Sequence, residues 1–264
     1  MDFLMTLKLS GRTHVAPADV LFDDLAIALA TAATQAVSER GAFHVALSGG
    51  STPEPFYMHL CIDPRYRGIP WDKMHVWIVD ERRVPEDHEK SNIRMIRESF
   101  TDHLPMKKRQ VHPMPVLLED PASAYIEEME RVFESTAASQ PGASLVTGSS
   151  IPRLDFVLLG MGDDGHTASL FPHSPALNEA EKWIANNDGP KVTPPPRVTM
   201  TYPLLNAARE LVVLCIGAKK HAMLKRVADQ LHKAGPDPQN LPITGIHPTQ
   251  GRLTWYLDAA AAGE

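Results

Sequence analysis

The sequence predicts an α/β fold built on a doubly wound, mostly parallel sheet with helices on both faces. Short apolar segments of strand character alternate along the chain with segments whose apolar residues recur at helical spacing, a pattern typical of such sheets. The composition, 43% hydrophobic and 22% charged, supplies enough apolar side chains for a substantial core. We predict a single domain over 1–264, because strand-like segments resume directly after a small polar stretch at 139–150, which we interpret as a surface loop.

The first half of the chain opens with a helix, predicted over 17–40 from apolar residues at helical spacing and from Gly41 as its stop. The apolar run at 43–47 predicts a strand, and the loop SGGSTP at 48–53 connects this strand to a second helix at 54–61. In the remainder of this half we expect a buried strand followed by two helices, at 75–79, about 92–104 and 122–138.

The second half begins with a third strong strand at 154–159. Further strands and one helix are expected after it, with strands at 198–201, 211–216 and 253–257 and the helix at 219–231. The three strongest strands of the chain end in SGGST, DERR and GMGDDGH. Because ligands of doubly wound sheets bind beyond the carboxyl ends of the strands, we expect these three loops to converge on one crevice.

The charge and the termini restrict the class of protein. A formal net charge of −6 argues against nucleic acid or an anionic membrane as the main partner. The N-terminal segment lacks the basic start and unbroken apolar stretch of a secretory signal, and no apolar run approaches the ~20 residues that a membrane span needs. The two cysteines, Cys61 and Cys215, show no metal-ligand spacing. We therefore expect a cytoplasmic protein with no metal site.

The motif GMGDDG at 160–165 is a literal G-x-G-x-x-G directly after a predicted strand. A preceding strand fits the dinucleotide-binding fingerprint. Asp163 and Asp164, however, occupy positions where backbone amides would face a pyrophosphate, and carboxylates there repel phosphate. The motif also lies past the midpoint of the chain rather than in its first strand–helix unit. An NAD-dependent dehydrogenase is therefore the less favoured interpretation, which a cofactor titration would test.

The alternative is that the glycines let the chain turn sharply, so that Asp164 and His166 reach the crevice. Histidine has an unperturbed pKa of about 6.5, which suits general base catalysis near neutral pH. A neighbouring carboxylate holds the ring in one tautomer and stabilises the imidazolium that forms. A histidine can also serve only in packing or capping, and the chain contains 12 of them. The position of His166, after a strand and between two other polar loops, favours catalysis.

The loop SGGSTP has the composition of an anion-binding nest, since backbone N–H groups, hydroxyl donors and the positive end of a helix dipole converge there. No G-K-[ST] follows, so a nucleoside triphosphate is not implied. The same letters also fit an ordinary strand-to-helix turn. The candidate cations for a bound phosphate lie close to predicted strands: Arg82, Arg197, Lys219 and Lys220. Lone cations at such places are commonly solvated surface residues, but a phosphate in an acidic protein needs one or two of them.

Together these segments resemble the glucosamine-6-phosphate isomerase/6-phosphogluconolactonase family, and within it the lactonases. The blocks that carry the resemblance run in order along most of the chain: SGGSTP (48–53), VDERRVPEDHEKSN (79–92), LLGMGDDGHTASLFP (158–172), PPPRVTMTYPLLNAAR (194–209), GAKKHAMLKRV (217–227) and GRLTWYLD (251–258). The resemblance implies a single domain with a Rossmann-like parallel sheet, no dinucleotide or other cofactor, and a monomer. It also implies hydrolysis of 6-phospho-D-glucono-1,5-lactone to 6-phosphogluconate, in the oxidative pentose phosphate pathway.

The resemblance assigns substrate-side roles to individual positions. The family's phosphate loop matches Ser48, Gly49, Gly50, Ser51 and Thr52. Arg197 in PPPRVT and Lys220 in GAKK match its phosphate-side cations, whereas Lys219 does not fall on the family spacing. Asp80 and Arg82 of the DER motif match positions near the substrate. Oxyanion stabilisation is left open between Arg82 and loop amides.

On the catalytic side, His166 matches the family's proposed general base and Asp164 the carboxylate beside it. The related isomerases resemble this motif but carry a glutamate that assists ring opening where this chain has Phe171. An apolar side chain cannot relay a proton, so an amino-sugar phosphate isomerase/deaminase is disfavoured. A non-catalytic sugar-phosphate sensor is the other alternative, although a sensor needs only the phosphate loop and not the Asp164–His166 pair.

Overall fold

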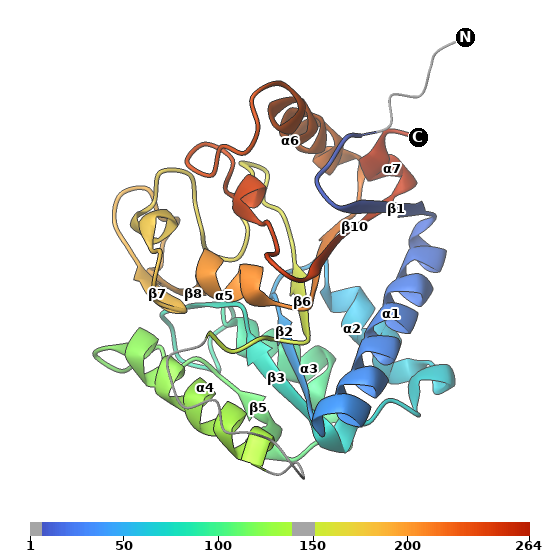
Figure 1. Cartoon of the computed structure of the whole chain (residues 1–264), viewed down its shortest axis with the longest axis vertical. Helices are drawn as coiled ribbons and strands as arrows, with labels where there is room; N and C mark the ends of the chain where they lie inside the picture. The colour runs from blue at the N-terminus through green and yellow to red at the C-terminus, as the bar shows by residue number, and fades with distance from the viewer. Residues whose placement is uncertain (1–6, 139–150) are drawn as a thin grey trace.

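The structure, a computed structural model, describes residues 7–138 and 151–264. Seven parallel strands form its main sheet in the order β1-β10-β9-β6-β2-β3-β5, and helices flank this sheet (Figure 1). The strands are β1 (Arg12–Ala16), β2 (Phe43–Leu47), β3 (Met74–Ile78), β5 (Val111–His112), β6 (Phe156–Leu159), β9 (Glu210–Cys215) and β10 (Arg252–Asp258). The predicted α/β fold with a mostly parallel sheet is confirmed. The loop expected at 139–150 lies outside the described residues, and the assignment of the whole chain to one domain stays a prediction.

The centre of the sheet consists of runs that the sequence predicts as strands. Every side chain of β2 and β6 is buried, as a parallel strand covered on both faces requires. β2 lies between β3 and β6, with Val45 paired to Val76 on one side and to Phe156 on the other. These residues belong to the hydrophobic core. The two edge strands, β1 and β5, were not predicted.

Seven α-helices lie among the described residues. They are α1 (Ala18–Arg40), α2 (Glu54–Ile62), α3 (Asn92–Ser99), α4 (Pro121–Ala138), α5 (Tyr202–Ala207), α6 (His221–Lys233) and α7 (Ala259–Ala262). As predicted, α1 stops at Gly41, whose φ of 76° lets its N–H donate to the carbonyl of Val37.

The helix α1 is long and apolar enough to cross a membrane, by length and average hydropathy alone. An uninterrupted apolar run of this length is absent from the helix, because acidic residues such as Asp23 separate its apolar residues, and for this reason the sequence does not predict it as a membrane span. In the structure its buried face includes Leu21, Leu25 and Leu29, and the helix packs against β2 and β10. The apolar residues of α1 thus form part of the hydrophobic core.

A second, antiparallel sheet has three strands in the order β4-β8-β7. They are β4 (Asp80–Arg82), β7 (Ile184–Asn187) and β8 (Arg197–Met200). Two predictions were wrong here: the first three residues of DERR form a strand rather than a loop, and the strand expected at 198–201 does not join the parallel sheet. β8 pairs instead with β4, which places Arg82 opposite Arg197. A charged strand of three residues has no apolar periodicity that would reveal this pairing.

Candidate active site

The segments that follow β2 and β6 meet β4 at a cleft of about 310 Å³. Because β2 and β6 are parallel neighbours, the loops that begin after Leu47 and Leu159 leave the same edge of the main sheet. The predicted residues that line this cleft are Ser48, Gly49, Gly50, Ser51, Thr52, Asp80, Arg82, His166 and Arg197. The three polar segments therefore converge as expected, although one of them is a strand.

His166 reaches the cleft from the turn after β6, and its side chain is 32% exposed. Oδ1 of Asp164 accepts hydrogen bonds from the ring Nδ1 at 2.6 Å and from the backbone N–H of His166 at 3.0 Å. Because the carboxylate accepts, Nδ1 carries the proton and Nε2 keeps its lone pair. Within residues 7–138 and 151–264, Nε2 has no hydrogen-bond partner. This nitrogen is the one available to act as a base.

The surroundings of the imidazole fix both its charge partner and its orientation. Partial burial raises the pKa of Asp164, but hydrogen bonds from the ring and the backbone N–H of His166 outweigh it and bring the pKa to about 2. The carboxylate is therefore ionised at neutral pH and stabilises an imidazolium beside it. The buried ring of Phe171 packs against the imidazole, with the two ring centroids 4.7 Å apart.

The GMGDDG turn supports His166 rather than a pyrophosphate. The N–H of Gly162 donates to the carbonyl of His166, and the N–H of Gly165 donates to the carbonyl of Gly162. A Cβ on Gly162 would lie 2.1 Å from atoms of the imidazole ring, so only glycine leaves room for the ring. No α-helix follows the turn, since the next element is a short 3₁₀ helix at Pro175–Asn178. The dinucleotide fingerprint lacks its helix here.

The loop after β2 leaves several donors without partners. The hydroxyl of Ser48 is buried, yet its Oγ has no hydrogen bond in the part of the chain that the structure describes. In the same part of the chain, the backbone N–H groups of 49–52 donate no hydrogen bond. The loop also leads into the N-terminus of α2, whose dipole favours an anion. These are the features of an anion-binding nest.

Two arginines on the second sheet add positive charge to the cleft. Arg82 donates from Nη1 to the carbonyl of Lys90, while its buried Nε has no partner among the described residues. Arg197 is 7% exposed, and among the described residues its guanidinium donates only to the carbonyl of Thr193. Burial lowers the pKa of the Arg197 guanidinium, as expected for a cation whose desolvation is only partly compensated. A bound phosphate would supply the missing partner.

A buried network, which sequence reasoning missed in part, joins the second sheet to the turn that carries His166. Oδ2 of Asp80 accepts a hydrogen bond from the hydroxyl of Ser169 at 2.5 Å, and the N–H of Ser169 donates to Oγ1 of Thr199 at 3.1 Å. The amide of Asn92 donates to the carbonyl of Asp80 at 2.7 Å. Ser169 and Asn92 line the cleft too. Both lie in the sequence blocks DERRVPEDHEKSN and GHTASLFP, which was the signal that could have found them.

Two of the predicted residues, Asp164 and Lys220, are not among the residues that line the cleft. Asp164 acts there only through its hydrogen bond to His166, and Lys220 is held by other contacts. Its Nζ donates to the carbonyl of Met161 at 2.8 Å and to Oδ1 of Asp163 at 2.5 Å. The hydrogen bond from Lys220 lowers the pKa of Asp163. In this arrangement Lys220 neutralises an aspartate of the GMGDDG turn and braces that turn from outside the cleft.

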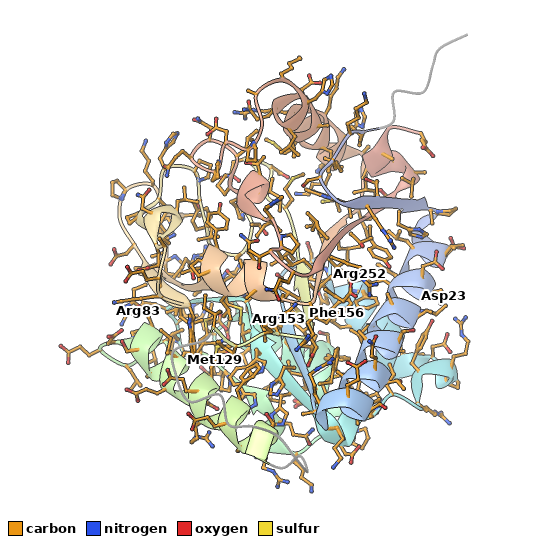
Figure 2. The ribbon with its side chains drawn as sticks, in the orientation of Figure 1. Asp23, Arg83, Met129, Arg153, Phe156 and Arg252 are labelled. Atoms are coloured by element: carbon orange, nitrogen blue, oxygen red, sulfur yellow. The ribbon has the colours of Figure 1, made fainter. Side chains whose placement is uncertain are left out.

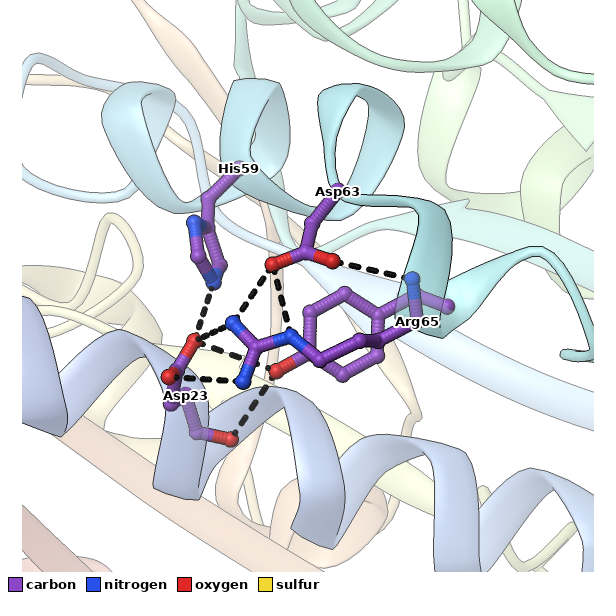
Figure 3. A network of polar contacts seen from close by, with 5 residues as sticks. Asp23, His59, Asp63 and Arg65 are labelled. Carbon is purple, nitrogen blue, oxygen red and sulfur yellow. Dashed lines mark hydrogen bonds and ion pairs between the residues drawn. The ribbon is translucent and has the colours of Figure 1, made fainter.

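One group of possible metal ligands lies elsewhere among the described residues, at Asp23, His59 and Asp63 (Figure 3). The guanidinium of Arg65 lies between its two carboxylates, with Nη2 at 2.7 Å from Asp23 and Nε at 2.9 Å from Asp63. His59 completes the network through Nε2, 2.8 Å from Asp23. Arg65 thus supplies the positive charge that a metal would supply, and the network ties α1 to the end of α2.

Comparison with known proteins gives one consistent result. Residues 16–255 match the family model described as glucosamine-6-phosphate isomerases/6-phosphogluconolactonase. A 6-phosphogluconolactonase from Synechocystis sp. is 40% identical over 248 residues, which is 92% of each chain. Solved 6-phosphogluconolactonases from Thermotoga maritima and Trypanosoma brucei have TM-scores of 0.72 and 0.73 and identities of 26% and 25%. The first match covers 94% of this chain and 99% of that chain, and the second covers 97% and 98%. This chain therefore belongs to the glucosamine-6-phosphate isomerase/6-phosphogluconolactonase family.

Proposed function

We propose that this chain hydrolyses 6-phospho-D-glucono-1,5-lactone to 6-phospho-D-gluconate, the lactonase step of the oxidative pentose phosphate pathway. The named relatives that it matches over most of its length are 6-phosphogluconolactonases. The single observation that carries the mechanism is the cleft itself. It combines a histidine whose free ring nitrogen is set by Asp164 with buried donors, on Ser48 and Arg82, that have no partner among the described residues.

In this proposal the 6-phosphate binds in the loop after β2. The N–H groups of 49–52 and the Ser48 hydroxyl donate to its oxygens, and Arg82 and Arg197 balance its charge. Pinning the phosphate at one end of the cleft holds the lactone ring near His166. The carboxylate of Asp80 also lines the cleft and accepts a hydrogen bond from Ser169. Because this acceptor is anionic, it suits a sugar hydroxyl rather than the phosphate.

The chemical step is direct attack of water on C1 of the lactone. Nε2 of His166 takes a proton from the water as its oxygen bonds to C1, and Asp164 stabilises the imidazolium. The tetrahedral intermediate then collapses: the bond from C1 to the ring oxygen breaks, and the imidazolium gives its proton to that oxygen. The donors available for the oxyanion are the Arg82 guanidinium and loop amides. The carboxylic acid that forms releases a proton to solvent.

The test is a coupled assay in which an NADP⁺-linked dehydrogenase oxidises the 6-phosphogluconate formed, with spontaneous hydrolysis subtracted. His166→Ala should lower kcat by about 10²–10⁴-fold, the typical contribution of general base catalysis, while product binding by calorimetry persists. His232→Ala, on the exposed face of α6, is the matched control and should retain wild-type turnover. An unchanged kcat in His166→Ala would remove His166 from this role.

The two alternatives make different predictions. A glucosamine-6-phosphate deaminase would release ammonia from glucosamine 6-phosphate, and we expect none, because Phe171 places a buried apolar ring beside His166. A non-catalytic sensor would bind 6-phosphogluconate without accelerating lactone hydrolysis, so the coupled assay separates it directly.

We further propose that the enzyme acts as a monomer in the cytoplasm on this small-molecule substrate. The acidic net charge of −6 supports a partner other than nucleic acid or an anionic membrane. Light scattering of the purified chain at assay concentration tests the first point, and cell fractionation tests the second.

A further inference from the structure

A second, larger cleft lies at the amino-terminal ends of the strands of the main sheet, whereas His166 lies beyond their carboxyl ends. Its volume is about 580 Å³, and its lining includes Phe156, the first residue of β6, and Glu210, the first residue of β9. The active cleft begins after Leu159, the last residue of β6. Figure 2 shows Arg153, Phe156 and Arg252 close together at this amino edge of the sheet, and all three line the cleft. We call this site the amino-edge cleft.

Positive charge exceeds negative charge in the amino-edge cleft. Five arginines line it, from β1, α1, the segment before β6, the segment before β9, and β10: Arg12, Arg40, Arg153, Arg209 and Arg252. Among the described residues, three with carboxylates line it as well: Glu39, Asp155 and Glu210. The surplus of two positive charges lies in a chain whose formal net charge is −6. In an acidic protein, a concave site lined by several cations has a locally positive electrostatic potential, which attracts anions.

The three carboxylates already form ion pairs with two of the arginines, Arg40 and Arg252. Arg40 pairs with Glu39 and, from Nε at 3.0 Å, with the buried Asp155. Arg252 pairs with Glu210. These contacts join the end of α1 and the start of β10 to the neighbouring strands, as expected of structural ion pairs. The other three arginines that line the cleft are Arg12, Arg153 and Arg209.

Arg153 is held in place without being neutralised. Its Nε donates to the carbonyl of Ala207 at 2.9 Å, and its two Nη atoms approach the side-chain and backbone oxygens of Gln250 at 3.2 and 3.3 Å. All three acceptors are neutral. Arg12 is exposed, and its side chain makes no hydrogen bond or ion pair within residues 7–138 and 151–264. The full charges of Arg12 and Arg153 therefore remain available to a ligand.

Arg209 lies near Arg40 and Arg153, and their positive charges affect its pKa. Its buried Nε is 3.3 Å from Oδ1 of Asp155 but forms no hydrogen bond among the described residues. Burial, together with the nearby positive charges of Arg40 and Arg153, lowers the pKa of the Arg209 guanidinium. The neighbouring carboxylates of Asp155 and Glu39 oppose this shift only in part. An anionic ligand would relieve the repulsion that remains among the arginines.

We propose that the amino-edge cleft binds a phosphate-bearing metabolite with at least two negative charges, through Arg12, Arg153 and Arg209. The planar fork of arginine matches the oxygens of phosphate in bidentate fashion. The volume of about 580 Å³ falls in the usual range of small-molecule sites. The site is separate from the proposed catalytic function and stands whether or not that function holds. Its position at the other end of β6 makes it a second ligand site on the same sheet.

The experiment titrates inorganic pyrophosphate into the full chain labelled with ¹⁵N at arginine, and follows the side-chain Nε–H signals assigned by single substitutions. The signals of Arg153 and Arg209 should shift along one saturating curve. That of Arg226, exposed on α6, should not follow it. Removing one charge-assisted contact in Arg153→Gln should raise the Kd of pyrophosphate about tenfold, whereas Arg226→Gln should change it less than twofold.

Two further variants keep the outcome unambiguous. Arg12→Gln removes a side chain without a partner in the described residues, so it should weaken pyrophosphate binding severalfold without affecting the fold. Arg197→Gln alters only the active cleft and should leave the shifts of Arg153 and Arg209 intact. The proposal is overturned if these two signals show no saturable shift, if they move no more than that of Arg226, or if Arg197→Gln abolishes their response.

Discussion

Replacing Asp164 with asparagine removes the negative charge beside His166 while keeping an oxygen in the same place. In the structure a single oxygen, Oδ1, accepts both the ring Nδ1–H at 2.6 Å and the backbone N–H at 3.0 Å. An asparagine Oδ1 accepts from the same two donors. The substitution should therefore keep the tautomer that leaves Nε2 free, and lose only the stabilisation of the imidazolium.

The size of the effect follows from this geometry. A hydrogen bond to a charged group contributes about 1.5–3 kcal/mol, and one between neutral groups about 0.5–1.5 kcal/mol. The carboxylate already accepts from the neutral ring, but it attracts the ring more strongly once the ring is protonated. If this added attraction is of the same size, about 1–1.5 kcal/mol, its loss raises the barrier by that amount and lowers kcat about tenfold. His166→Ala should lose about 10²–10⁴-fold. The aspartate variant should thus lie clearly between the wild type and the histidine variant.

The coupled lactonase assay measures both variants beside Asp229→Asn, which makes the same chemical change on the exposed face of α6 and should leave kcat within twofold of wild type. The pH profile adds a second readout. Because the pKa of Asp164 is about 2, its titration should contribute no limb above about pH 3. A wild-type kcat in Asp164→Asn, or a loss as large as that of His166→Ala, would refute the reasoning.

The remaining predictions concern the turn and the fold. Gly162→Ala should lower kcat by at least tenfold with unchanged circular dichroism, since a Cβ would lie 2.1 Å from the His166 ring; full activity would show that the ring need not occupy that position. Lys220→Gln should lower the melting temperature while changing the KM for the lactone less than threefold, because Nζ braces the turn; a tenfold rise in KM would place Lys220 on the phosphate instead. Arg65 lowers the pKa of Asp63 from 3.8 to about 2, so this pair stabilises the fold above about pH 4 and its contribution disappears as the pH falls to about 2. The melting-temperature advantage of wild type over Arg65→Gln should vanish over that interval, and an advantage that persists at pH 2 would contradict this.

The sequence was most informative where local pattern and tertiary role coincide. The predicted bounds of β2 and the stop of α1 at Gly41 match the structure, because a strand buried on both faces needs a continuous apolar run and an αL helix end favours glycine. The position of His166 in a cleft with the SGGST loop followed from the rule that loops at the carboxyl ends of parallel strands converge.

The strands that the sequence did not predict have a common physical feature: each forms only because a segment distant in the sequence pairs with it. The strand β4 is three charged or polar residues that become a strand only because β8 pairs with them. β5 has two residues, and β1 has an exposed Arg12 and little alternation, so neither shows a strand period. The phosphate role that the spacing of Lys220 implies stays a prediction. Its ion pair with Asp163 also could not be predicted, because it depends on where the loop after β9 meets the turn after β6.

The measurement that tests the central claim most directly compares kcat/KM for 6-phosphogluconolactone with kcat/KM for the unphosphorylated lactone, in the wild type and in Arg197→Gln. If the loop after β2 and the two arginines pin the phosphate while His166 acts on the ring, the wild type should strongly prefer the phosphorylated lactone. The loss of one buried charge-assisted contact should then reduce that preference by about 10–100-fold. Equal hydrolysis of the two lactones by the wild type, or an unchanged preference in Arg197→Gln, would contradict the account.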